Sequence, residues 1–117
     1  MSGPDALARR AAQRYVDAVN DADGERLLAL FDEHATLLHP TGRYEGHASI
    51  RRFYEEIVFA GRARLRPGRL VAEDRTAMLE FFATSPLADA DAAPLRTLDV
   101  FTVDGNGAIT ELVVYYL

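Results

Sequence analysis

The chain has 117 residues, with 18 acidic and 13 basic side chains, and a formal net charge of −5 at pH 7. Every basic residue other than histidine is an arginine, and lysine, cysteine and tryptophan are absent. Without lysine there is no Schiff-base catalysis and no lysine-containing phosphate loop. Without cysteine there is no disulfide, thiol nucleophile or thiolate-bound metal.

Size and composition favour one domain that spans residues 1–117, because 49% of the residues are hydrophobic and can form one core. The acidic balance argues against nucleic-acid binding. No apolar run approaches the roughly 18 residues of a membrane span, and residues 1–10 lack the apolar stretch of a signal peptide. We therefore expect a cytoplasmic protein without membrane contact, and the arginine-rich, lysine-free usage suggests a GC-rich bacterial source.

The first predicted element is an amphipathic helix. Ser2 and Asp5 resemble a capping box, and Pro4 lies in the first turn. Apolar residues then recur at three- and four-residue spacing, while the intervening positions are polar. The apolar positions are Leu7, Ala8, Ala11, Ala12, Tyr15, Val16 and Val19.

Three short elements follow. Residues 20–24 end the first helix and cap a second one, which carries apolar side chains over 27–31. A brief strand at 35–38 then runs into a turn of typical composition at 39–42. A third helix carries apolar side chains inward between residues 50 and 58.

The second half of the chain predicts an antiparallel sheet. Residues 73–75 and 104–107 are typical of hairpin turns, and 85–94 form a loop of small residues. Pro67-Gly68 interrupts the first strand, which indicates a bulge or an edge position. Helices followed by strands predict an α+β domain with helices on one face of a curved sheet. The predicted strands are 62–72, 77–84, 95–103 and 109–116.

Asp99 is the most unusual residue of the predicted sheet. By alternation it shares a strand face with Thr97 and Phe101. If that face is covered, burial raises the pKa of the carboxyl group, which then stays protonated and donates a hydrogen bond. The alternative is a face that contacts solvent or a dimer partner, and position alone favours neither.

Two tyrosines lie on apolar helix faces. The hydroxyl group of Tyr15 points into the interior and needs a partner there. A phenol is a good neutral donor to a developing oxyanion, although a core tyrosine with a structural hydrogen bond is the more common case. Tyr54 on the third helix has the same two interpretations.

His39 follows the first predicted strand and precedes a proline, at the expected mouth of a pocket. An unperturbed pKa of about 6.5 suits a general base at neutral pH, although a histidine before a turn is more often a surface residue. His34 and His39 face opposite ways on one strand, and no carboxylate completes a ligand pattern. We therefore expect neither a metal site nor a cofactor.

Glu80 shares a strand face with Met78 and Phe82, which makes it a second candidate for a polar group in the interior. The alternative for Glu80 is the exposed face of the sheet, which is the more common case. None of the serines lies in a Gly-x-Ser-x-Gly elbow, which argues against a serine hydrolase.

Taken in order, several segments resemble the ketosteroid isomerases and the broader SnoaL-like branch of the nuclear-transport-factor-2-like superfamily. The resemblance implies a cone of curved antiparallel sheet around a deep apolar pocket, closed by about three N-terminal helices, with dimerisation through the sheet. The segments are Gln13-Arg14-Tyr15-Val16 with Asn20, Leu28-Ala29-Leu30-Phe31, Ala35-Thr36, His39-Pro40-Thr41-Gly42, Ile50-Arg51-Arg52-Phe53-Tyr54, Leu98-Asp99-Val100-Phe101 and Asp104-Gly105-Asn106-Gly107.

The resemblance also implies roles for individual residues. Tyr15 matches the oxyanion-hole tyrosine, Asp99 the protonated second donor, and Tyr54 the tyrosine that hydrogen-bonds the first. An aspartic acid kept neutral by an apolar site is the recorded behaviour of ketosteroid isomerase itself. His39 stands where the family has its catalytic aspartate. The expected pocket residues are Phe31, Phe53, Ile57, Met78, Glu80, Phe82 and Phe101.

Two functions are compatible with this pattern. The first is an isomerase that moves a proton next to a carbonyl through an enolate stabilised by Tyr15 and Asp99, with His39 as the base. The second is a polyketide cyclase or dehydratase, or a non-catalytic binder of a hydrophobic ligand. Both imply a steroid- or polyketide-like small molecule, whereas a pure dimerisation module would have a filled interior.

Overall fold

The computed structural model describes residues 3–117. The predicted capping role of Ser2 lies outside these residues. The first helix, α1 (Pro4–Asn20), begins after Gly3 with proline in its first turn, as predicted. A second, short helix, α2 (Gly24–Leu28), is capped by the side chain of Asp23, which accepts a hydrogen bond from the Arg26 backbone N–H. Because both helices present apolar side chains on one face, they pack against other elements rather than standing free: α1 against the sheet, and α2 against α1 and the third helix.

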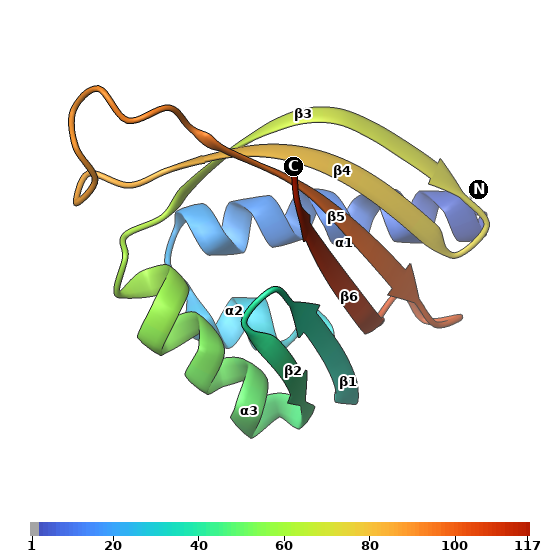
Figure 1. Ribbon diagram of the computed structural model, residues 1–117. Coiled ribbons are helices and arrows are strands. Elements are labelled where there is room, and N and C mark those ends of the chain that lie inside the picture. The colour runs from blue at the N-terminus through green and yellow to red at the C-terminus, as the bar shows by residue number, and fades with distance from the viewer. Residues whose placement is uncertain (1–2) are drawn as a thin grey trace.

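The six strands form one curved sheet in the order β2-β1-β6-β5-β4-β3 (Figure 1). All neighbouring strands are antiparallel except β1 and β6, which are parallel. The predicted α+β architecture is therefore confirmed, with one parallel junction where the C-terminal strand returns beside the first one. The strands are β1 (Phe31–His39), β2 (Gly42–Glu45), β3 (Arg64–Glu73), β4 (Thr76–Thr84), β5 (Leu95–Val103) and β6 (Ile109–Tyr116).

The N-terminal strands differ from the prediction. Strand β1 starts at Phe31, which the sequence assigned to the second helix, because Phe31 pairs with Ile109 of β6. Strand β2 was not predicted: the predicted turn at 39–42 includes only its first residue, Gly42, and no element was predicted for 43–45. Its residues are mostly exposed, so they carry no alternation of apolar and polar side chains that would indicate a strand. Pairing with β1 alone places this segment in the sheet.

The third helix consists of two parts. A regular segment, α3 (Gly46–Phe53), continues as a π-helical segment over Tyr54–Phe59. Phe53 and Tyr54 are consecutive, yet both are buried. π-helical turns are rare and occur frequently at functional sites. Here the change of helical pitch begins at Tyr54, a predicted site residue.

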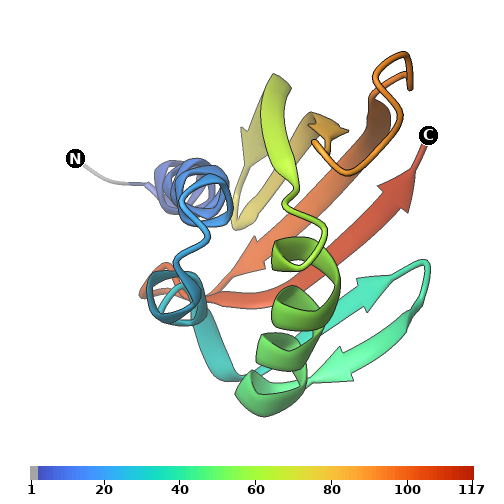
Figure 2. The same ribbon diagram turned by 90° about the vertical axis from the view of Figure 1, so that its left-hand side faces the viewer.

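The sheet curls around α1, and the third helix closes the lower part of the cone (Figures 1 and 2). Strand β3 is an edge strand, and its pairing with β4 shifts register between Pro67 and Leu70. This confirms the predicted bulge or edge position at Pro67-Gly68. The concave face of the sheet and the helices enclose the core, and the cone stays open where β3 and the 85–94 loop begin.

Candidate active site

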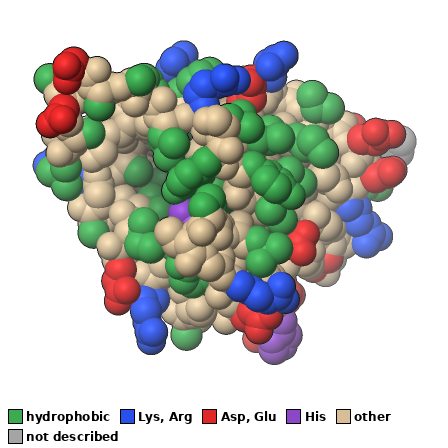
Figure 3. Space-filling view, in the orientation of Figure 1, with side chains coloured by type: hydrophobic (Ala, Val, Ile, Leu, Met, Phe, Trp, Pro, Cys, Tyr) green, Lys and Arg blue, Asp and Glu red, His purple; other side chains and the backbone are tan. Residues whose placement is uncertain are grey.

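A cavity of about 180 Å³ lies between α1, the third helix and the concave face of the sheet. It combines apolar walls with a few polar side chains, which is typical of small-molecule sites. Figure 3 shows hydrophobic side chains around a hollow on this face, with part of one histidine among them. The cavity is lined by Tyr15, Val19, His39, Phe53, Tyr54, Ile57, Val58, Ala63, Leu65, Phe81, Ala83, Leu95, Thr97, Asp99, Val114 and Tyr116.

Tyr15 and Tyr54 form a buried hydroxyl pair on one side of this cavity. Their Oη atoms lie 2.7 Å apart, and both side chains are at most 5% exposed. The ring of Tyr15 also packs edge-on against Phe101, with 5.1 Å between ring centroids. Burial raises the pKa of both phenols. For Tyr15, electrostatic repulsion from Tyr54 and Asp99 raises the pKa further. Both hydroxyls therefore remain protonated and act as neutral donors.

Asp99 faces the same cavity and is only 3% exposed. Burial raises the pKa of its carboxyl group to about 7, although a hydrogen bond from Thr97 Oγ1 to Oδ1 (2.9 Å) acts in the opposite direction. Within residues 3–117, no fully buried side-chain polar atom lacks a partner. Since only Oδ1 has a hydrogen-bond partner there, Oδ2 is accessible from the cavity.

His39 lies where β1 ends, packed against Phe53 with 4.7 Å between ring centroids. Its Nδ1 accepts a hydrogen bond from the Thr41 backbone N–H (3.1 Å) and lies 2.9 Å from Thr41 Oγ1. On the other side, Nε2 lies 3.0 Å from the Tyr116 hydroxyl. Because a backbone N–H can only donate, the resting neutral ring carries its proton on Nε2. Burial lowers the pKa of His39, which keeps the ring neutral at pH 7.

The three predicted catalytic residues, Tyr15, His39 and Asp99, and the supporting Tyr54 thus line one cavity. Two of the predicted pocket residues, Phe53 and Ile57, line it as well. Phe31 and Phe101 do not reach it. They are buried behind the wall, where Phe31 packs near Tyr54 and Phe101 packs against Tyr15.

Three pocket predictions are corrected by the structure. Met78, Glu80 and Phe82 lie on the convex face of the sheet, while the alternate residues Leu79 and Phe81 point inward. Glu80 accepts hydrogen bonds from the guanidinium group of Arg69, which lowers the pKa of this carboxyl to about 2. The ring of Phe82 lies 4.6 Å from the guanidinium carbon of Arg66. The physical reason is the β4–β5 register, which pairs Leu79 with Asp99 and so places Leu79 on the inner face.

Three polar residues at the site were not predicted. Alternation had placed Thr97 on the strand face of Asp99, two residues away. Its hydroxyl group was the signal that could have identified it as a hydrogen-bond partner of the carboxyl group. Tyr116 reaches the cavity because it pairs with Thr97 across β5 and β6. Thr41 contacts the ring of His39. Neither of these last two carries a local sequence signal for its role.

No group of three or more potential metal ligands occurs within residues 3–117. The protonatable groups of the cavity are phenols, one carboxyl and one imidazole. Separately, none of the helices between residues 3 and 117 has the length and apolar character needed to cross a bilayer.

Comparison with known proteins relates the chain to one family. A family model described as the SnoaL-like domain matches residues 12–112. Among curated proteins no match was found. Many solved structures have the same fold. The three described next are less than 25% identical to this chain, so they show the fold alone.

Three of the similar solved structures differ in the activity that their names give. A Kribbella flavida protein, provisionally assigned as a ketosteroid isomerase, is 22% identical with a TM-score of 0.84, covering 98% of this chain and 81% of that one. A Sinorhizobium meliloti protein, provisionally assigned as a polyketide cyclase, is 19% identical with a TM-score of 0.80, covering 91% and 94%. The epoxide hydrolase/cyclase-like enzyme SalBIII, which acts in pyran ring formation of salinomycin, is 22% identical with a TM-score of 0.79, covering 94% and 90%.

Proposed function

The chain belongs to the SnoaL-like domain family, and from this premise we propose that its cavity is an active site for cofactor-independent proton transfer next to a carbonyl group. The ligand is a hydrophobic carbonyl compound, whose oxygen accepts hydrogen bonds from Tyr15 and protonated Asp99. His39 moves a proton between carbons of the same molecule. The observation that carries this proposal is the position of all three side chains on one apolar cavity.

The two donors act on the charge that develops during the reaction. Removing a proton from the carbon next to a carbonyl places negative charge on its oxygen, and preorganised donors in an apolar site stabilise that charge. When Tyr54 donates to the oxygen of Tyr15, the Tyr15 proton is free to bind the ligand. Burial raises the pKa of Asp99 to about 7, so the protonated form that donates to the ligand is accessible near neutral pH.

His39 is the proton carrier. The proton leaves the substrate carbon for Nε2 and returns to a different carbon, so nothing is consumed. In the resting pocket Nε2 already carries a proton, and the ring must therefore change tautomer before it can act as a base. Thr41 Oγ1, 2.9 Å from Nδ1, is positioned to accept the Nδ1 proton in that second tautomer.

A direct assay follows the absorbance of the conjugated enone formed from a Δ5-3-ketosteroid and from a single-ring β,γ-unsaturated ketone. We expect turnover by the wild type and losses of about a hundredfold or more in Tyr15→Phe and His39→Ala. The matched control is Glu80→Gln, which removes a carboxylate from the convex face of the same sheet and should leave the rate unchanged. Wild-type rates no higher than buffer with both ketones would contradict the isomerase function.

One observation favours a second function, cyclisation or dehydration of a polyketide-like ligand. The resting tautomer already offers a donor at Nε2, and the ionised fraction of Asp99 already offers a base. Loss of water from a β-hydroxy ketone needs both groups, and it needs no tautomer change at His39. Mass spectrometry of a β-hydroxy ketone incubated with the wild type and with Asp99→Asn tests this function. If neither the unsaturated ketones nor the β-hydroxy ketone reacts, but a phenol that occupies the place of the ligand binds, the protein binds its ligand without turnover.

A further inference from the structure

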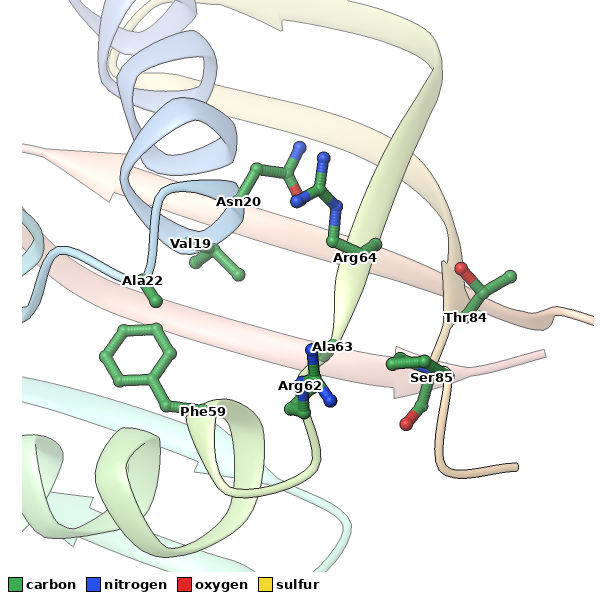
Figure 4. Close-up of a pocket in the computed structure, with 10 residues that line it drawn as sticks. Val19, Asn20, Ala22, Phe59, Arg62, Ala63, Arg64, Thr84 and Ser85 are labelled. Carbon is green, nitrogen blue, oxygen red and sulfur yellow. The ribbon is translucent and has the colours of Figure 1, made fainter.

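The cavity opens into a larger hollow of about 570 Å³ at the open end of the cone. Val19 and Ala63 line both spaces. Figure 4 shows this outer hollow between the C-terminal end of α1, the end of the third helix, the start of β3 and the segment at Ser85. The inner cavity and the outer hollow are therefore adjacent, and one of the two residues between them, Ala63, has a small side chain.

Two arginines give the outer hollow a positive charge. Arg62 and Arg64 line it, and its lining contains no carboxylate. Both arginines are exposed, and neither pairs with an acidic side chain within residues 3–117. Asp89 lines an adjacent hollow rather than this one. In a chain with a net charge of −5, this local positive charge stands out and would attract anions.

The backbone that carries the two arginines is held in place. Arg62 adopts a left-handed conformation, with φ of 54°, which is uncommon for a residue with a Cβ atom. Its N–H donates to the Phe59 carbonyl (2.9 Å), and the Ala63 N–H donates to the Val58 carbonyl (3.1 Å). The amide side chain of Asn20 hydrogen-bonds both the N–H and the carbonyl of Leu65. The two bonds to Phe59 and Val58 form a Schellman motif, the common C-terminal cap of a helix, with Arg62 at its left-handed position. This cap and Asn20 fix where the two arginines enter β3.

The size of the inner cavity restricts the ligand. An apolar cavity of about 150 Å³ holds one benzene molecule, and the inner cavity here measures about 180 Å³. About one ring therefore fits between Tyr15, Asp99 and Phe53. The inner cavity borders two hollows: the outer one, and a second of about 590 Å³ along the 85–94 loop, which is lined by Asp89 and by the shared residues Ile57, Ala83 and Leu95. An anionic tail is favoured in the outer hollow, where the arginines lie, over the second hollow, where Asp89 would repel it.

We propose that the ligand is an amphipathic acid: a carbonyl-bearing head of about one ring in the inner cavity, joined by a short chain to a carboxylate or phosphate that binds Arg62 and Arg64. The contact of the head with Tyr15 and Asp99 rests on the proposed function. The contact of the anionic group depends only on the two arginines and on the passage at Ala63. Guanidinium groups bind both kinds of anion through paired N–H donors.

Equilibrium binding of four phenols tests the proposal, because the phenolate form resembles an enolate in shape and charge. The probes are para-ethylphenol, para-hydroxyphenylpropionate, its methyl ester, and the phosphate ester of para-hydroxyphenylethanol. We expect the wild type to bind the acid about fivefold more tightly than its ester, as for a partly exposed ion pair. The carboxylate and phosphate probes distinguish the two anion sources.

Variants assign the effect to this surface. Arg62→Gln/Arg64→Gln should abolish the preference for the acid and leave para-ethylphenol binding unchanged. The control is Arg66→Gln, which removes one positive charge from the convex face, where Arg66 covers Phe82. Ala63→Leu should narrow the passage and weaken binding of the acid, whereas Ala63→Ser should not.

The outcomes separate the two proposals. Equal binding of each anion and its neutral analogue by the wild type, or an equal loss in Arg66→Gln, would overturn the anionic-group proposal. Turnover of the neutral single-ring ketone, measured on the same preparations, decides the proposed function independently. A double arginine variant that retains ketone turnover while losing its preference for the acid would support both.

Discussion

The hydroxyl oxygens of Tyr15 and Tyr54 lie 2.7 Å apart, although 39 positions separate the two residues in the chain. Each is the only hydrogen-bond partner of the other within residues 3–117. An unpartnered buried hydroxyl costs about 1–3 kcal/mol, so the two side chains depend on each other for stability. The same contact orients the Tyr15 proton, and it therefore couples the stability of the core to the chemistry of the cavity.

A double-mutant cycle tests this dependence. We expect Tyr15→Phe and Tyr54→Phe each to lower the free energy of unfolding by about 1–3 kcal/mol, because each leaves one buried hydroxyl without a partner. The double variant should lose less than the sum of the two. Urea unfolding measures the three values, and strictly additive losses would show that the hydroxyl pair is not a unit. Phenol binding should weaken most in Tyr15→Phe, since Tyr54 acts through Tyr15.

Asp99 makes stability depend on pH in a defined direction. Its pKa is about 7 in the folded protein, against about 3.9 for an unperturbed aspartate. The native state therefore holds this proton over a range in which the unfolded state has lost it. Asp99 therefore makes its full contribution to the free energy of unfolding below about pH 4. This contribution is lost as the pH rises towards 7, with a slope of up to about 1.4 kcal/mol per pH unit.

Asp99→Asn should remove this dependence, because the amide does not titrate. The comparison is made by chemical unfolding at several pH values between 3 and 8. Glu80→Gln provides the contrast of opposite sign: the pKa of Glu80 is lowered to about 2 by Arg69 and Arg96, so its contribution is lost as the pH falls below about 4.5. Parallel pH profiles for the wild type and Asp99→Asn would contradict the raised pKa.

The hydroxyl of Thr41 should stabilise the second, basic tautomer of His39. Thr41→Ala removes the hydroxyl that accepts the Nδ1 proton but keeps the backbone N–H that donates to Nδ1. We expect kcat of the isomerase reaction to fall about tenfold or more, since the basic tautomer loses its partner. Thr41→Ser keeps the hydroxyl and should retain most activity. Nitrogen chemical shifts of the imidazole should show the same resting tautomer in both proteins, because the backbone N–H remains. Equal kcat values in the wild type and Thr41→Ala would show that the hydroxyl has no such role.

We propose that the convex face of the sheet forms the contact of a homodimer. Val71, Met78 and Leu117 are 64%, 46% and 62% exposed there, and together with Leu98 they line one shallow apolar hollow. Met78→Glu would place a charge at the centre of this face and should convert a dimer into a monomer. Leu87→Glu in the 85–94 loop is the matched control, because Leu87 is 64% exposed but lies away from this face. Sedimentation of the wild type as a monomer would contradict the proposal.

The sequence determined the elements that have a clear period. The three- and four-residue spacing of apolar side chains predicted α1, and strict alternation over 95–103 placed Asp99 on the same strand face as Thr97 and Phe101. Both patterns depend on one buried face per element, so local spacing was sufficient. The acidic, lysine-free and cysteine-free composition had already limited the chemistry to imidazole, phenol and carboxyl groups.

Only the tertiary structure decided which face of β4 points inward. Phe81 and Phe82 are both large and apolar, so alternation shows that they lie on opposite faces of the strand but not which of the two faces the core. The ten-residue loop at 85–94 is too long to fix the register between β4 and β5. The pairing of Leu79 with Asp99 fixes this register and places Glu80 on the convex face of the sheet. The neighbours of His39 were decided in the same way, because β6 returns parallel to β1 and brings Tyr116 beside the ring. Strand pairing over long distances in the chain therefore completed a site that the sequence had identified only residue by residue.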